Sequence, residues 1–106
     1  MKDNLHTPWS DEIELLSFAD NQDPEGYGVE AAAKRTLFCT WDDGVSQKEF
    51  YLSHKEGLEA SASADIWRVD YEGERYARFR GKLYRVIRSF PSSFDTLTLM
   101  LAEVIR

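Results

Sequence analysis

The clearest pattern in the sequence is the alternation of polar and apolar residues between Ile66 and Phe90. In the second half of this stretch the residues divide between two parities, with Tyr84, Val86, Arg88 and Phe90 on one and Leu83, Arg85 and Ile87 on the other. Alternation with a period of two, rich in aromatic and β-branched residues, is typical of β-strands. Gly81, between two such runs, indicates a tight hairpin turn, and Gly73 indicates an earlier turn where a positive φ costs little. We therefore expect three strands arranged as a meander.

The pattern on either side of this region predicts the remaining strands. Residues 11–18 alternate imperfectly, which favours a short strand, although a helical turn also fits. Within residues 29–43 a helix-prone stretch (EAAAKR) precedes a strand-like one (TLFCTW), so we expect a loop arm that enters a long second strand. Residues 59–64 are small and polar and predict a connector or the entry to an edge strand. The last strand is expected at residues 95–105, where three leucines share one face.

One α-helix is predicted, over residues 46–56. Ser46 and Glu49 form a capping box, in which the hydroxyl accepts from the Glu49 N–H and the carboxylate reaches back to the Ser46 N–H. Gly57 suits the position just past the end of the helix. A helix of this length is marginal in isolation. Its stability must therefore come from packing, and it can rearrange when the packing changes.

At 106 residues the chain has room for one hydrophobic core. We assign residues 11–106 to a single domain and residues 1–10, which are polar and contain Pro8, to a flexible N-terminal extension. The fold is expected to be mainly β: a small six-stranded β-barrel, or partly closed antiparallel sheet, with one short α-helix between strands 2 and 3. The single cysteine, Cys39, is expected to be a small buried residue of a cytosolic protein. No apolar run follows Met1, so we expect neither a signal peptide nor a membrane span.

The net charge of −6 hides a segregation of charge along the chain. Residues 75–94 contain six basic residues and no acidic one, whereas the other 86 residues contain 7 basic and 19 acidic residues. These six residues, which we call the basic hairpin, are Arg75, Arg78, Arg80, Lys82, Arg85 and Arg88. Two interpretations remain open. The six side chains either pair with the acidic remainder of the chain, or form a basic face for phosphate groups or for an acidic neighbouring subunit.

The sequence predicts no catalytic, metal or cofactor site. His6 and His54 lie far apart and have no cysteine or carboxylate at the spacing of metal ligands. Ser46 is explained by its capping box, and the pair Asp42-Asp43 by a turn. The sequence contains no phosphate-binding loop, dinucleotide-binding motif or nucleophile elbow. We therefore expect that the protein is not an enzyme.

A set of short motifs follows one another in a specific order. In sequence, the chain contains Phe38-Cys39, Val45-Ser46-Gln47, Glu49-Phe50-Tyr51, Gly57-Leu58, Asp70-Tyr71, Gly73-Glu74, Phe79, Gly81-Lys82, Tyr84, Val86, Arg88 and a final strand of alternating leucines. In this order and spacing the chain, over residues 11–105, resembles the head-closure proteins (head–tail joining or stopper proteins) of tailed phages of Gram-positive hosts. It departs from their pattern in its longer N-terminus and in the stretch EASASADIW, where family members often carry a more apolar run.

The resemblance implies a small β-barrel that assembles as a ring below the portal and adaptor of the phage neck. There it would retain the packaged genome and provide the docking surface for the tail. Its partners would be the adaptor or connector ring, the tail proteins and further copies of itself, with packaged DNA as a further contact and no membrane. The protein would be made in the host bacterial cytoplasm and would end in the virion, at the head–tail interface. No cofactor is implied.

The resemblance also implies which segment faces the DNA channel. In the family, the segment between the second and third strands faces the channel and can refold on assembly. Here this segment is residues 44–64, which contain the predicted helix. The channel-facing residues would be Ser46, Gln47, Lys48, Glu49, Tyr51, His54 and Lys55. The basic hairpin would contact an acidic neighbouring subunit or the end of the DNA.

A second hypothesis comes from a different class of protein, an OB-like module that binds single-stranded nucleic acid. Its stacking surface would be formed by Tyr76, Arg78, Phe79 and Tyr84. The negative net charge is unfavourable for this function, and aromatic residues on alternating strands are more often part of a core. Salt-dependent binding of the free monomer to an oligonucleotide would favour this hypothesis.

Overall fold

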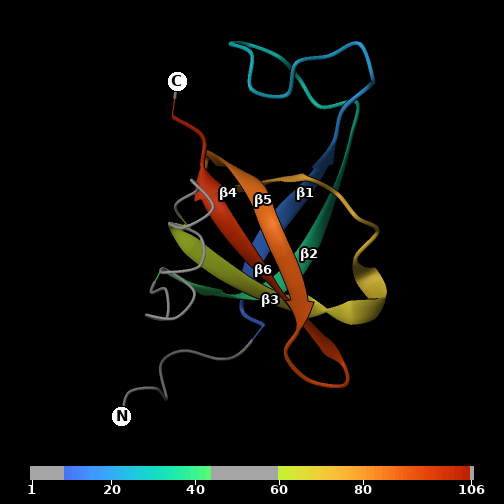
Figure 1. Ribbon diagram of the computed structural model, residues 1–106, viewed down its shortest axis with the longest axis vertical. Helices are drawn as coiled ribbons and strands as arrows, with labels where there is room; N and C mark the ends of the chain where they lie inside the picture. Colours follow the sequence, from blue (N-terminus) through green and yellow to red (C-terminus); the bar gives the residue numbers. More distant parts are fainter. Residues whose placement is uncertain (1–8, 44–59, 106) are drawn as a thin grey trace.

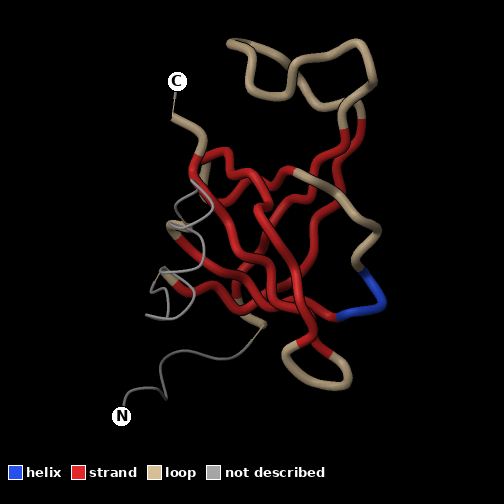
Figure 2. Tube along the Cα trace, viewed as in Figure 1, coloured by secondary structure: helices blue, strands red, loops and turns tan. Residues whose placement is uncertain are grey.

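Residues 9–43 and 60–105 are described by a computed structural model of the chain (Figure 1, Figure 2). They form six strands and one 3-10 turn: β1 (Asp11–Ser17), β2 (Ala33–Asp42), β3 (Ala62–Trp67), η2 (Arg68–Asp70), β4 (Tyr76–Phe79), β5 (Lys82–Pro91) and β6 (Thr96–Glu103). No α-helix occurs within these two ranges. The helix predicted over residues 46–56 lies outside the described residues.

The six strands close into a barrel in the order β1-β2-β3-β6-β5-β4, and every neighbouring pair is antiparallel. The barrel closes because β1 pairs with β2 along one edge and with β4 along the other. Closure gives every described strand a hydrogen-bonded neighbour on both sides, although β2–β3 and β1–β4 each pair over only three residues. The prediction of a mainly β, six-stranded barrel is therefore confirmed.

The expected meander over residues 66–90 is only partly correct. β4, β5 and β6 are consecutive neighbours, but β3 lies between β2 and β6 and does not pair with β4. η2 and the segment 71–75 separate β3 from β4 along the chain, so no tight turn joins these two strands (Figure 1). Alternation along a strand shows which face is buried, but it carries no information about which strand lies alongside. β3 also begins at Ala62, inside the stretch expected to be a connector.

The predicted turns are confirmed where a glycine requires a positive φ. Arg80 and Gly81, which join β4 to β5, have φ values of 51° and 82°. A positive φ at both central residues is the geometry of the two-residue hairpin turn whose twist matches that of the flanking strands. Gly73 has a φ of 87° in the loop before β4. The helical alternative for residues 11–18 is excluded, because β1 pairs with β2 along its whole length.

The interior of the barrel is occupied by side chains of alternate residues from all six strands, as expected for a small barrel. Trp41 stacks on Phe79 with ring centroids 3.7 Å apart and meets Tyr84 edge-on. The buried cluster comprises Ile13, Leu15, Cys39, Ala62, Ala64, Ile66, Ala77, Phe79, Tyr84, Leu97, Leu99 and Leu101. The predicted burial of the single cysteine is confirmed. Burial, with smaller contributions from two nearby aspartates, raises the pKa of this thiol to about 12.

Candidate functional site

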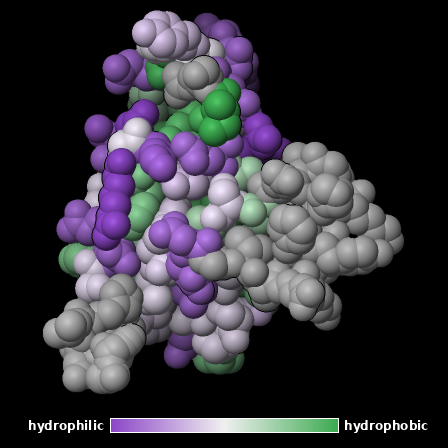
Figure 3. Space-filling view, turned by 90° about the vertical axis from the view of Figure 1, so that its left-hand side faces the viewer, coloured by the Kyte–Doolittle hydropathy of each residue, from purple (hydrophilic) through white to green (hydrophobic). Residues whose placement is uncertain are grey.

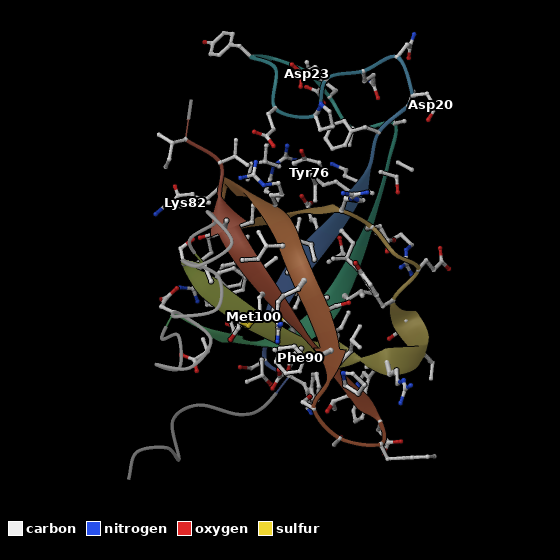
Figure 4. All side chains as sticks on the ribbon, viewed as in Figure 1. Asp20, Asp23, Tyr76, Lys82, Phe90 and Met100 are labelled. Carbon is white, nitrogen blue, oxygen red and sulfur yellow. The ribbon has the colours of Figure 1, made fainter. Side chains whose placement is uncertain are left out.

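The basic hairpin extends from Arg75, just before β4, through β4 and the following turn into β5. In β4 the inward residues are Ala77 and Phe79, so Arg78 points outward. Arg88, the last basic residue, is on the outward side of β5 because the strand is irregular before it. A bulge in β5 shifts the register so that Arg88 pairs with Met100, which alternates with the inward leucines of β6. Figure 4 shows Met100 and Phe90 at the same part of the β5–β6 pair. The shared parity of Tyr84 and Arg88 in the sequence was therefore misleading, because the bulge separates their faces.

Three arginines of the basic hairpin form ion pairs with acidic residues of the same chain. Arg78 Nη1 lies 3.5 Å from Glu14 Oε1, Arg80 Nη2 lies 3.4 Å from Asp11 Oδ1, and Arg85 Nη1 lies 2.5 Å from Glu25 Oε2. The three acids belong to β1 and the β1–β2 loop, next to β4 in the closed barrel. For these three arginines the structure supports the first interpretation, pairing within the chain. Such exposed pairs each stabilise a fold by only about 0–1 kcal/mol.

Glu25 connects the β1–β2 loop to the outer face of β4 and β5. Its Oε2 atom accepts hydrogen bonds from Tyr76 Oη at 2.7 Å and from Arg85 Nη1. Phe18 packs edge-on against Tyr76 with centroids 5.6 Å apart, and Figure 4 shows Tyr76 below the loop that carries Asp20 and Asp23. Burial and then the Glu25 hydrogen bond raise the pKa of Tyr76, and the same carboxylate raises the pKa of Arg85.

A groove of about 430 Å³ runs beside this cluster. It is bounded by the end of β1, the start of the β1–β2 loop, the segment before β4, and Arg85. Its lining mixes both signs of charge with apolar side chains: Leu16, Ser17, Phe18, Pro24, Glu72, Gly73, Glu74, Arg75, Tyr76 and Arg85. Within residues 9–43 and 60–105 no group of three or more histidine, cysteine, aspartate or glutamate side chains is placed to hold a metal ion.

A buried ion pair at one end of the barrel was not anticipated from the sequence. Arg35 lies opposite Leu15 in the β1–β2 register, and its guanidinium donates to Glu74 Oε2 from Nε at 2.9 Å and to the Asp70 carbonyl from Nη2 at 2.6 Å. The Glu74 side chain is only 5% exposed, against 34% for Arg35. The Glu74 carboxylate also accepts from the backbone N–H of Glu72, and its carbonyl accepts from a tyrosine hydroxyl. These contacts fix the segment between η2 and β4 to the barrel.

The electrostatics of this pair favour the charged forms of both groups. Burial alone would raise the pKa of the Glu74 carboxyl, but the hydrogen bond from Arg35, two backbone N–H groups and the nearby positive charge together hold it below its usual value. The Arg35 pKa is raised mainly by its hydrogen bond to Glu74. The sequence did carry one signal. Arg35 shares the parity of Leu37, Cys39 and Trp41, which places a charge on the inward face of β2.

The outer side of β2 and β3 carries a second feature that the sequence did not identify as a site. We call Trp9, Phe38, Trp67 and Val69 the aromatic face. Phe38, Trp67 and Val69 are 58%, 42% and 88% exposed. Trp9 stacks on Trp67 with centroids 4.5 Å apart, and its backbone N–H donates to Thr40 Oγ1 at 3.1 Å. The sequence left open whether Trp9 anchors on the domain or on a partner, and in the structure it packs on the domain.

Two other sets of predicted residues can now be placed. All seven channel-facing residues, from Ser46 to Lys55, lie outside the described residues. Of the four residues of the proposed nucleic-acid stacking surface, Phe79 and Tyr84 are 5% and 6% exposed and pack against Trp41 inside the barrel. Tyr76 and Arg78 are half-buried. The barrel also has six strands, whereas an OB-fold has five. The OB-like hypothesis therefore loses two of its four stacking residues.

Comparison with known proteins identified no relative: no protein-family model and no curated protein sequence matches the chain. Among the described residues there is no helix of the length and apolar character needed to cross a membrane.

Proposed function

We propose that this chain is a structural protein of a phage or prophage neck rather than an enzyme. It assembles as a ring below the portal and adaptor, closes the DNA channel and presents the docking surface for the tail. The observation that best supports this proposal is the small closed barrel with an interior packed by its own side chains. A barrel packed in this way binds other molecules through its outer surface and its loops, as a structural subunit does.

The outer surface supports a role in assembly. Six large apolar side chains among the described residues are more than 40% exposed: Tyr27, Phe38, Trp67, Val69, Phe94 and Ile105. Three of them, Phe38, Trp67 and Val69, belong to β2, β3 and η2, and exposed apolar side chains grouped in this way mark sites of protein–protein contact. The basic hairpin adds Arg80 and Lys82, both exposed at the β4–β5 turn, as a contact for an acidic neighbouring subunit or for the DNA end.

The channel-closing part of the proposal concerns the connection between β2 and β3. β2 ends at Asp42 and β3 begins at Ala62, so this connection is long for neighbouring antiparallel strands. The segment expected to face the channel, residues 44–64, is shortened at its end, because Ala62 and Ala64 are buried in β3. We propose that residues 44–61 face the channel and that residues 46–56 form a short capped helix there. Copies of this segment, brought together by the ring, narrow the channel and hold the packaged DNA.

The test is electron microscopy of a lysate from the parent phage, or from the induced prophage, with this gene deleted. We expect heads emptied of DNA beside complete free tails, because an open neck neither retains the genome nor binds a tail. Expression of the wild-type gene from a plasmid should restore joined particles. A deletion lysate with full heads joined to tails would refute the proposal.

A further inference from the structure

The aromatic face combines side chains of two neighbouring strands with Trp9 and Val69. β2 and β3 pair from Thr40 opposite Asp65 to Asp42 opposite Ser63, so Phe38 and Trp67 each lie two residues beyond the last pair, on the outward side of their strands. Val69 follows Trp67 in η2 and is 88% exposed. Phe38, Trp67 and Val69 are large and exposed, and Trp9 is stacked on Trp67. Exposing apolar side chains to water costs free energy, and contact with another apolar surface removes that cost.

The border of the aromatic face is mainly acidic. Glu12 lies directly opposite Phe38 in the β1–β2 register, and Asp65 lies two residues before Trp67 on the same side of β3. Asp95 lies at the other edge, where its carbonyl accepts from the backbone N–H of Arg68 at 2.8 Å. Arg68 adds one positive charge. A partner that fits this face therefore presents apolar side chains beside basic ones.

The opposite side of the same barrel presents such a surface. In the closed order β1-β2-β3-β6-β5-β4, the β2–β3 pair lies diametrically across from the β5–β4 pair. There a hollow of about 480 Å³, which we call the hairpin hollow, is lined by Tyr27, Arg78, Gly81, Lys82, Leu83, Glu103, Val104 and Ile105. Figure 4 shows Lys82 on this side, and the space-filling view of the same side in Figure 3 shows an apolar area in its upper part.

The hairpin hollow combines the two properties that the aromatic face requires. Tyr27 and Ile105 are 94% and 80% exposed, so the hollow has apolar walls open to solvent. Lys82 lines the hollow and is exposed, whereas Arg78 is paired with Glu14 and Glu103 adds a negative charge to the lining. Lys82 is therefore the positive charge that can meet Glu12 when the two surfaces join.

We propose that the aromatic face of one copy docks into the hairpin hollow of the next copy. Because the two surfaces lie on opposite sides of the barrel, each copy can bind one neighbour at each side in the same sense, which is a heterologous contact. A two-fold contact between two aromatic faces would instead oppose one Glu12 region to another, which like charges disfavour. The inference supplies the subunit interface of the ring and relies on the proposed function only for the closure of that ring.

The contact can be tested by disulfide formation between single-cysteine variants of the full chain, in a Cys39→Ala background. Phe38→Cys copies are mixed with Ile105→Cys copies under oxidising conditions, because Ile105 lines the hairpin hollow and Lys82 then keeps its charge. We expect a mixed disulfide dimer, and little dimer when either variant is oxidised alone. The control replaces Phe38→Cys with Asp20→Cys, which lies in the exposed β1–β2 loop, and should give little mixed dimer (Figure 4). Circular dichroism checks that each variant is folded.

A charge exchange then tests the complementarity itself. Glu12→Lys in the copy that presents the aromatic face should reduce the yield of the mixed dimer, and so should Lys82→Glu in the copy that presents the hairpin hollow. When both copies carry their change, the yield should be restored, because the opposed charges are then exchanged. Absence of the mixed dimer, or dimers of Phe38→Cys alone, would overturn the proposal and assign the aromatic face to another protein or to a two-fold contact. If deletion of the gene opens the neck but the cross-link does not form, the proposed function stands and this interface is wrong. If the cross-link forms but the deletion leaves the neck intact, the self-association stands and the proposed function is wrong.

Discussion

The buried pair of Arg35 and Glu74 gives the sharpest prediction about stability. Replacing Arg35 by methionine keeps most of the length of the side chain but removes the guanidinium, which donates to the Glu74 carboxylate and to the Asp70 carbonyl. The Glu74 side chain, 5% exposed, would then be left as a carboxylate without its countercharge. Breaking a fully buried pair costs about 3–5 kcal/mol, and because Arg35 is about one-third exposed we expect about 2–3 kcal/mol here.

Urea denaturation followed by tryptophan fluorescence measures this loss, because Trp41 is packed inside the barrel and its environment changes on unfolding. A matched control is Arg80→Met, which removes an arginine that is 76% exposed and pairs with Asp11, and should cost at most about 1 kcal/mol. Arg35→Met should lower the Tm by roughly 8–20 °C for a domain of this size. If the two variants lost the same free energy of unfolding, the reasoning about the buried pair would be wrong.

Three further predictions concern Glu74, Gly81 and Cys39. The folded-state pKa of Glu74 lies below its unfolded value of about 4.3, so the ionised carboxylate stabilises the fold above that pH. This contribution is lost as the pH falls through the folded pKa. Glu74→Gln should therefore lose less stability than wild type between pH 6 and pH 3, and equal losses would contradict this. Gly81→Ala should lower the free energy of unfolding, measured by urea denaturation, by about 1–2 kcal/mol. The φ of Gly81 is 82°, and an added Cβ would meet no atom within 4 Å, so only backbone strain acts. Gly81→Asn should lower it less, because asparagine adopts a positive φ more readily. Cys39 is buried and its pKa is raised to about 12, so it should react with a thiol reagent at pH 8 only in denaturant. Rapid labelling of the native protein would contradict this and would show that the barrel opens.

The fold could be predicted from the sequence as far as local pattern determines it. Period-2 alternation identified the strands, and Gly81 identified the hairpin turn, because both signals depend on residues close together in the chain. The partners of β3 could not be predicted in this way. They depend on how the barrel closes, and β3 pairs with β2 and β6, which are distant in sequence from the strand that follows it.

The candidate site was predictable only in part. The basic hairpin is visible in the sequence as a run of basic residues, but the pairing of three of them with Asp11, Glu14 and Glu25 depends on the contact between β1 and β4 that closes the barrel. The bulge in β5 moved Arg88 away from the face of Tyr84, and one inserted residue leaves no clear mark on an alternating pattern. The aromatic face depends on two strands lying side by side, so neither strand alone indicated it.

The central claim is that the protein is located in the neck of a virion, and immunogold electron microscopy of purified particles tests this most directly. Antibodies against the purified protein would be applied to wild-type virions and, as the control, to particles from the deletion strain complemented with an unrelated gene. The account predicts gold label at the head–tail junction of wild-type particles and none on the control. Wild-type virions without label, together with absence of the protein from their mass-spectrometric composition, would contradict it.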